Sequence, residues 1–205
     1  MLQKTQQDSY QNAVCDAMYA APEEVMPLVC LTKNSDMVTW NEEGDKVLLL
    51  TWHKYPEGYI AGKSMELEWG PVWAFTDQEI LAWFRDHKKG VKDWDLRMKQ
   101  LIGLPPESDY THFSAFWVSA DDIYRPAYCT DVEQTTMYCE FQTQTSEEYK
   151  KWFNETILNF YYEEQYPWTR LGYTYDWYED EVECTYSNKE FVEWLSHEVE
   201  REETQ

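Results

Sequence analysis

An aromatic stretch near the C-terminal end contains the residues best suited to hold a ligand or a partner. Nine of the nineteen residues from Phe160 to Tyr178 are aromatic, and Arg170 is the only cation between Lys151 and Lys189. A guanidinium can stack on an aromatic ring or pair with a carboxylate. A pocket for a flat ligand, or a face that grips a partner, would be lined by Trp168, Arg170, Tyr173, Asp176 and Trp177.

Three consecutive carboxylates, Glu179, Asp180 and Glu181, extend this candidate partner-binding set. From Glu140 to the C-terminus the chain carries 17 Asp and Glu residues against 5 Lys and Arg residues. More than half of the net charge of −22 therefore lies in the last third of the sequence. Such a surface would attract a basic groove through its charge and anchor in it through its rings. The alternative is an acidic surface that serves solubility alone.

The same stretch also has a structural interpretation. Large apolar residues alternate with small or polar ones from Leu171 to Tyr178, which predicts a half-buried strand. Aromatic residues at such spacing are usually core residues, and Arg170 would then form an ordinary ion pair. A third interpretation is an accessory protein that self-associates through this strand, which requires its row of rings to be exposed.

A second candidate site lies in the middle of the chain, where Asp121 and Asp122 precede Arg125. Paired carboxylates can bind a metal ion or supply a general base. Acidic residues are also ordinary at the start of a helical turn, where Arg125 would pair with one of them. Both interpretations remain open at this point.

The other reactive side chains form no catalytic motif. The seven glycines contain no phosphate-binding loop of the GxGxxG or GxxxxGK[ST] type, so no cofactor is expected. The four histidines are far apart and form no Cys/His cluster, so no metal site is expected. A nucleophilic pair could be made from Cys129 or Cys139 with His53 or His112. The alternative is that these cysteines are small buried hydrophobic residues.

Composition excludes several classes of protein. A net charge of −22 repels phosphates, so we expect a basic protein partner and no direct binding of nucleic acid. No apolar run approaches the roughly 18 residues that cross a bilayer, so no membrane association is expected. Residues 1–19 lack a signal-peptide pattern and no CxxC pair occurs, which predicts a cytoplasmic protein. If a leader was removed, the alternative is a secreted protein, in which Cys129 and Cys139 could be bridged.

Helical periodicity predicts most of the elements that would position these residues. Helices are expected over residues 6–19, 76–87, 93–102, 145–160 and 187–199, with a single helical turn over 119–122. Three of them begin with a capping box, Thr76 to Glu79, Thr145 to Glu148 and Ser187 to Glu190.

Short apolar runs bounded by turn residues predict the strands. Runs over 37–40 and 47–52 flank a polar turn with Gly44, and runs over 65–69 and 72–75 flank Gly70-Pro71. Further strands are expected over 112–119, 134–141, 171–178 and 182–186. Hairpin-sized connections favour an α+β fold, a mainly antiparallel sheet with about four to five helices packed against it. We expect residues 1–205 to form a single domain, the alternative being a loop hinge near 103–110.

Two functions from different classes fit these patterns. The first is a non-catalytic binding protein, such as an inhibitor, an immunity protein or an anti-defence factor. Its carboxylates would stand in for phosphates and block a basic, nucleic-acid-processing partner. The second is an enzyme or small-ligand-binding domain with a pocket around Arg170 and Asp176. The oligomeric state is not indicated by the sequence.

Overall fold

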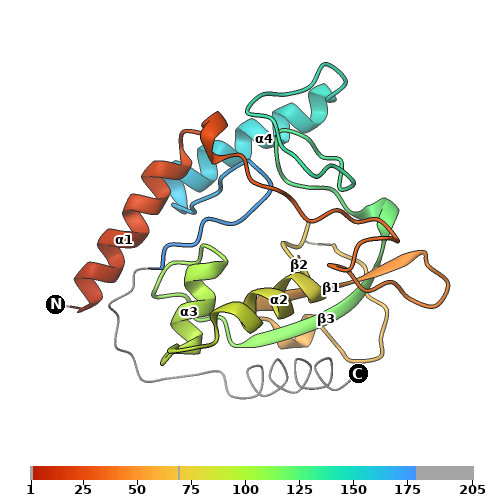
Figure 1. Ribbon diagram of the computed structural model, residues 1–205, viewed down its shortest axis with the longest axis horizontal. Coiled ribbons are helices and arrows are strands. Elements are labelled where there is room, and N and C mark those ends of the chain that lie inside the picture. The colour runs from red at the N-terminus through yellow and green to blue at the C-terminus, as the bar shows by residue number, and fades with distance from the viewer. Residues whose placement is uncertain (1, 69, 179–205) are drawn as a thin grey trace. The chain divides into compact units, whose positions relative to one another are not determined.

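The computed structural model describes residues 2–68 and 70–178 (Figure 1). Its main elements are α1 (Leu2–Ala17), β1 (Lys46–His53), β2 (Phe75–Thr76), α2 (Asp77–His87), α3 (Trp94–Leu101), β3 (His112–Ser119) and α4 (Glu147–Leu158). Short 3₁₀ turns cover Pro22–Glu24, Pro56–Gly58 and Ala120–Asp122, and a π-turn, Asn159–Glu163, continues α4. These four helices and the three-stranded antiparallel sheet confirm the predicted α+β class. No helix in the described ranges is long and apolar enough to cross a membrane.

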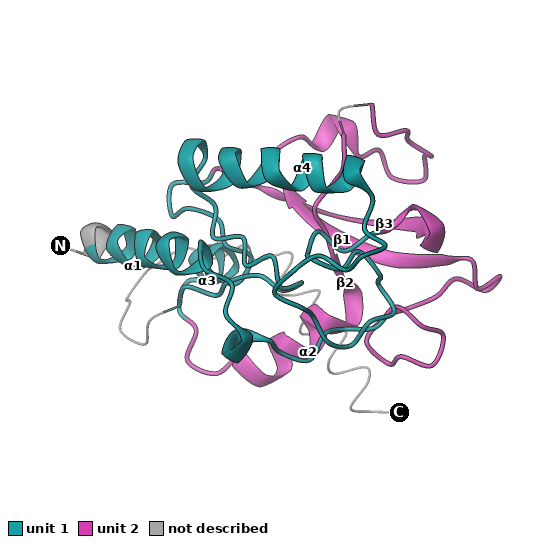
Figure 2. Ribbon diagram, turned by 90° about the horizontal axis from the view of Figure 1, so that it is seen from above, with its two compact units in different colours: residues 1–30, 92–108, 124–187 teal, residues 31–91, 109–123, 188–205 magenta. Residues whose placement is uncertain are grey.

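The chain divides into two compact units, each assembled from separate segments (Figure 2). The described part of unit 1 comprises residues 2–30, 92–108 and 124–178. The described part of unit 2 comprises residues 31–68, 70–91 and 109–123. One boundary between the two units lies between Ser108 and Asp109. It falls in the loop near 103–110, where the sequence allows a hinge as the alternative to a single domain. The single domain and the hinge both stay predictions.

The sheet belongs to unit 2 and has the strand order β2-β1-β3. β1 pairs with β3 along its whole length, from Lys46 opposite Ser119 to His53 opposite His112. The strand predicted over residues 112–119 is therefore confirmed. β1 is central and mostly buried, because no charged residue follows Lys46 until the strand ends. α2 lies across one face of the sheet (Figures 1 and 2).

The hairpin predicted around Gly44 forms in part. Trp40 makes an isolated bridge to Val47, and the carbonyl of Thr39 accepts a hydrogen bond from the N–H of Leu48. Gly44 closes the turn with a φ of 70°, which glycine adopts without steric cost. The first run is thus a single bridge rather than a strand.

The second predicted hairpin is wrong. Residues 65–68 and 70–74 form no strand, and only Phe75 and Thr76 pair with β1. Gly70 has a φ of 104°, outside the range of a strand. Pro71 has no N–H to donate to a ladder. The Gly70-Pro71 pair therefore ends regular pairing instead of turning one strand into the next.

α2 begins where predicted, but its side-chain cap differs from the predicted box. The Thr76 side chain makes no cap hydrogen bond. The buried carboxylate of Asp77 instead accepts hydrogen bonds from the N–H and hydroxyl of Thr39 and from the amide of Gln78. A carboxylate in the first turn is also favoured by the helix dipole. Asp77 thereby ties the start of α2 to the loop before β1.

The helices of unit 1 follow the predicted periodicity. α1 buries Tyr10, Ala13 and Val14 against Leu96 of α3. α3 begins at Asp93, whose carboxylate accepts from the N–H of Leu96 at 3.0 Å. The box predicted at Thr145 shifts by one residue: Ser146 caps α4, since its hydroxyl accepts from the N–H of Tyr149.

Two further strand predictions concern this part of the chain. The strand predicted over 134–141 does not form, because Met137 lies in a cluster of buried residues instead of a ladder. The strand predicted over 182–186 and the helix predicted over 187–199 lie outside the described residues.

His53, at the end of β1, anchors the loop that follows it. Its Nδ1 accepts the N–H of Tyr55 at 3.1 Å, and its Nε2 lies 2.8 Å from the hydroxyl of Ser114 on β3. The ring of Tyr59 stacks on it at 4.1 Å. Because Nδ1 is an acceptor, the neutral ring carries its proton on Nε2 and donates to Ser114. Burial and then His112 lower the pKa of His53, whereas Glu57 raises it.

We predict that His53 makes unit 2 less stable at mildly acidic pH. The pKa of His53 is lowered on folding, so the unfolded chain binds a proton first as the pH falls below about 6.5. The free energy of unfolding should therefore decrease from about pH 6.5 down to the folded pKa and level off below it. His53→Asn keeps an acceptor for Tyr55 and does not titrate. Denaturant unfolding at several pH values should show its deficit against wild type shrinking as the pH falls. A deficit independent of pH would contradict the prediction.

Candidate functional site

The aromatic stretch from Phe160 to Tyr178 forms part of the interior of unit 1. Trp168, Arg170 and Trp177 are buried, and Tyr173 is half-buried. The carboxylate of Asp176 remains partly exposed. Glu179, Asp180 and Glu181 lie outside the described residues. Three of the five described candidates therefore contribute little surface to a partner.

The strand predicted over Leu171 to Tyr178 does not form. Arg170 and Gly172 have φ values of 61° and 87°, and an extended strand requires negative φ. The chain instead closes a tight loop, in which Trp168 bridges Thr174 and the Thr169 hydroxyl donates to the carbonyl of Tyr173 at 2.6 Å. The alternating pattern thus belongs to an irregular, half-buried segment.

Arg170 is the polar centre of this segment. Its Nη2 donates to the carbonyls of Ala17 and Met18 at 3.3 and 2.7 Å, and its Nη1 donates to the hydroxyl of Tyr128 at 3.0 Å. The rings of Tyr128 and Tyr161 lie 5.6 and 5.4 Å from the guanidinium carbon. Carbonyls at a helix C-terminus carry partial negative charge, so Arg170 stabilises the end of α1. These contacts replace the ion pair expected from the sequence.

Tyr161 completes the surroundings of Arg170. Its hydroxyl lies 2.9 Å from the carbonyl of Ala17 and 2.5 Å from that of Trp168. Burial raises the pKa of Tyr161, and Arg170 offsets this only in part. The phenol therefore stays protonated and acts as a hydrogen-bond donor inside unit 1.

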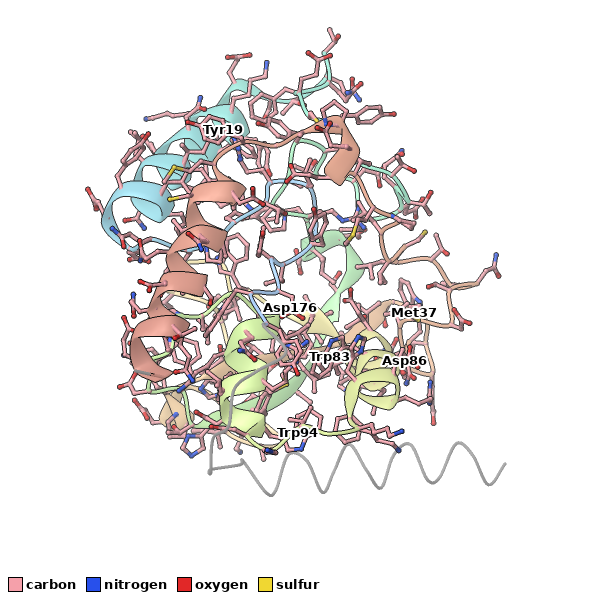
Figure 3. All side chains as sticks on the ribbon, turned by 60° about the vertical axis from the view of Figure 1, so that its left-hand side comes forward. Tyr19, Met37, Trp83, Asp86, Trp94 and Asp176 are labelled. Atoms are coloured by element: carbon pink, nitrogen blue, oxygen red, sulfur yellow. The ribbon has the colours of Figure 1, made fainter. Side chains whose placement is uncertain are left out.

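The carboxylate of Asp176, labelled in Figure 3, binds the guanidinium of Arg97 on α3. Arg97 is buried, and its two Nη atoms donate to the two carboxylate oxygens at 2.8 and 2.5 Å. The ring of Tyr178 covers the guanidinium at 4.5 Å. Arg170 and Asp176, which a pocket would need to bring together, are thus bound to different partners.

The two buried tryptophans fasten the segment at both ends. The indole N–H of Trp177 donates to the carbonyl of Leu104 at 3.1 Å, and its ring meets Tyr10 edge-on at 5.6 Å. The indole N–H of Trp168 donates to the carbonyl of Pro126 at 2.8 Å, and its ring lies 4.8 Å from Phe153. Their polar groups are satisfied within unit 1.

The second candidate cluster is divided between different environments. Asp121 and Asp122 are exposed on the 3₁₀ turn of unit 2, as the interpretation of a helical turn predicts. Arg125 belongs to unit 1 and is buried. Its guanidinium donates to the backbone carbonyls of Val29, Asp131, Val132 and Gln134. The partner expected from the sequence, a neighbouring carboxylate, is replaced by carbonyl groups.

Cys129 and Cys139 pack as small apolar residues. Cys129 and Cys139 are free thiols beside a buried cluster of Leu28, Ala127, Met137 and Leu171. Burial, with smaller effects from Glu24 and Glu23, raises the pKa of Cys139, which disfavours a thiolate. Within residues 2–68 and 70–178, no group of three or more His, Cys, Asp or Glu side chains could hold a metal ion.

The sequence gives no signal for the buried cations. Arg97 and Lys99 lie on α3, where a charged residue is ordinarily solvated. Lys99 instead donates to the carbonyl of Pro106 at 3.2 Å and pairs with Asp95 at 2.8 Å. The Asp95 partner of Lys99 follows from the i, i+4 spacing, whereas the Asp176 partner of Arg97 is 79 residues away and is recognised only in the folded chain.

Because these cations are buried, the exposed charges of unit 1 are mostly negative. Four of its cations, Arg97, Lys99, Arg125 and Arg170, are buried. Where side chains of unit 1 are described, the exposed cations are Lys92 and Lys151. The exposed carboxylates are Asp8, Asp16, Glu23, Glu107, Asp131, Glu133, Glu140, Glu147, Glu148, Glu155, Glu163, Glu164 and Asp176. Most of the exposed charged side chains described in unit 1 are therefore carboxylates.

No protein-family model, curated protein or solved structure matches this chain. Any functional conclusion therefore rests on the residues themselves.

We predict that Gly172→Ala destabilises unit 1 by about 2 to 4 kcal/mol. A Cβ at this position would lie 2.6 Å from Cδ of Arg125, whose guanidinium is fixed by four carbonyls, and the φ of 87° adds strain. Gly62→Ala is the matched control, because Gly62 has a φ of 73° and no atom within 4 Å of the added Cβ. Thermal unfolding should show a clearly larger loss for Gly172→Ala. Equal losses of stability in the two variants would mean that the close approach to Arg125 does not contribute to the destabilisation.

Asp176→Ala should lower the free energy of unfolding by about 2 to 3 kcal/mol, because it removes a carboxylate that the buried Arg97 binds through both Nη atoms. The partial exposure of Asp176 keeps the loss below that of a fully buried pair. Asp109→Ala, which removes the exposed partner of Lys54, should leave stability nearly unchanged. Urea denaturation measures both, and a negligible effect of Asp176→Ala would refute a structural role for the pair.

Proposed function

We propose that the protein is a non-catalytic binding protein that docks a basic protein partner through the acidic surface of unit 1. The observation that carries the proposal is the burial of Arg97, Lys99, Arg125 and Arg170, which leaves the exposed carboxylates with few cationic neighbours. A protein with a positively charged groove, such as a nucleic-acid-processing enzyme, is the partner that this surface suits. An inhibitor, an immunity protein or an anti-defence factor acts in this way.

Electrostatics supports this choice of partner. Exposed charges of one sign produce a field that extends about a Debye length from the surface, roughly 8 Å at physiological salt. That field repels nucleic acid and accelerates encounter with a basic protein. Carboxylates arranged on a folded surface can occupy a groove that ordinarily holds phosphates. The net charge of −22 reinforces the effect over the whole chain.

The geometry of the Ser114 and His53 pair does not fit a catalytic serine–histidine pair. Nδ1 of His53 accepts the N–H of Tyr55, so Nε2 holds a proton and donates it to the Ser114 hydroxyl. A catalytic histidine must instead accept the proton of its serine. The pocket alternative has no supporting contact either, because Arg170 binds carbonyls of α1 while Asp176 binds Arg97.

Affinity purification at low salt, followed by titration of the captured complex with salt, tests the proposal. We expect recovery of a protein of high isoelectric point whose affinity falls steeply between about 50 and 300 mM salt. An acidic or neutral partner, or binding insensitive to salt, would refute it.

Charge variants in the two units sharpen this test. Glu140→Gln/Glu148→Gln/Glu163→Gln removes three exposed carboxylates from unit 1. Glu42→Gln/Glu66→Gln/Glu68→Gln removes the same charge from unit 2. The proposal expects the unit 1 variant to weaken binding of the captured partner more than the unit 2 variant does. The reverse order would move the binding surface to unit 2.

A further inference from the structure

Two large apolar side chains interrupt the polar outer side of α4 and its π-turn. Leu158 is 60% exposed and Tyr162 is 69% exposed. Two other residues of the same segment, Phe153 and Tyr161, are buried in the core of unit 1. α4 is the upper helix of unit 1 in Figure 2. Leu158 and Tyr162 are therefore not needed to close the core.

The two side chains lie in line with the charged residues of α4. Glu147, Lys151, Glu155, Leu158 and Tyr162 follow one another at spacings of four, four, three and four residues. Residues three or four apart share one side of a helix. They therefore form a single strip that runs from the start of α4 into the π-turn.

The π-turn itself is unusual. The N–H of Glu164 donates to the carbonyl of Asn159, five residues earlier, at 2.8 Å. Such turns are rare and occur frequently at functional sites. Here the turn follows Leu158 directly and contains Tyr162, so the irregularity coincides with the exposed apolar pair.

Exposed carboxylates lie near the pair along the chain and can meet a partner. Glu155, Glu163 and Glu164 are exposed. Lys151 approaches Glu155 only to 3.9 Å, and both side chains are mostly in solvent. Such an exposed ion pair contributes little to stability, so Glu155 can pair with a cation of a partner instead. Tyr162 makes no hydrogen bond or ring contact with another residue in the described ranges.

We infer that the exposed pair Leu158 and Tyr162 on this strip, together with the neighbouring carboxylates Glu155, Glu163 and Glu164, is the docking site for the basic partner, an inference that rests on the proposed function. Its occupant is a partner segment in which apolar side chains alternate with arginine or lysine. The apolar groups bury Leu158 and Tyr162, and the cations pair with the surrounding carboxylates. A central apolar contact with a charged rim is the arrangement of an interface hot spot.

A defined probe tests the site without the natural partner. The probe is a short synthetic peptide in which arginine alternates with leucine, and a peptide with serine in place of leucine is its control. At about 150 mM salt we expect the leucine peptide to bind at least about tenfold more tightly than the serine peptide. Hydrogen exchange should show protection of the amides of residues 155–164 on binding. Leu158→Ala/Tyr162→Ala should abolish the difference between the peptides, while Tyr19→Ala, at another exposed aromatic residue, should preserve it.

The outcomes separate this inference from the proposed function. Binding of the leucine peptide with protection elsewhere on unit 1, or equal binding of both peptides, overturns the docking site and leaves an acidic binding surface. If neither peptide binds even at low salt, both the docking site and the proposed function are overturned. The thermal unfolding midpoints of the variants should match wild type, since the replaced side chains are exposed.

Discussion

Buried guanidinium groups that donate to backbone carbonyls hold unit 1 together. Arg170 binds the carbonyls that end α1, and Arg125 binds four carbonyls from two distant loops. Irregular backbone leaves carbonyls that no helix or ladder satisfies, and a buried carbonyl without a donor is costly. One guanidinium offers five donors in a fixed plane, so it can satisfy several such groups at once. The irregular architecture of unit 1 depends on these two side chains.

The same arrangement determines what unit 1 shows to solvent. A buried cation needs compensation, and here carbonyl dipoles, tyrosine rings and the Asp176 carboxylate supply it. Most of the described carboxylates of unit 1 remain exposed. The packing of the interior and the acidity of the surface are therefore one property of the sequence, and the proposed binding function follows from both.

The sequence predicted the regular elements better than the site. Periodicity placed the helices because a helix buries one side at a fixed repeat, and β3 ended where predicted because its apolar run is bounded by polar residues. The alternating pattern predicted a strand over residues 171–178 that does not form. The hydrophobic pattern carries no information about the left-handed backbone of Arg170 and Gly172. The partner of Asp176 could not be predicted, because Arg97 lies 79 residues away and looks like a solvated helical residue. Leu158 and Tyr162 could have been found, as apolar residues on the polar side of an amphipathic helix.

Residues 165–170 of unit 1 form hydrogen bonds with residues near the start of the chain. Arg170 bonds to Met18 across 152 residues, and Tyr10 bonds to Gln165 across 155. The described segments of unit 2 all lie between residues 31 and 123. On the ribosome, these segments emerge before α1 can meet its C-terminal contacts, and long-range closure is slow because of its entropic cost. The part of α1 that packs on Trp168 and Trp177 thus stays uncovered until synthesis has passed residue 177, although Leu96 of α3 is made earlier. A nascent chain is most exposed to aggregation in this interval.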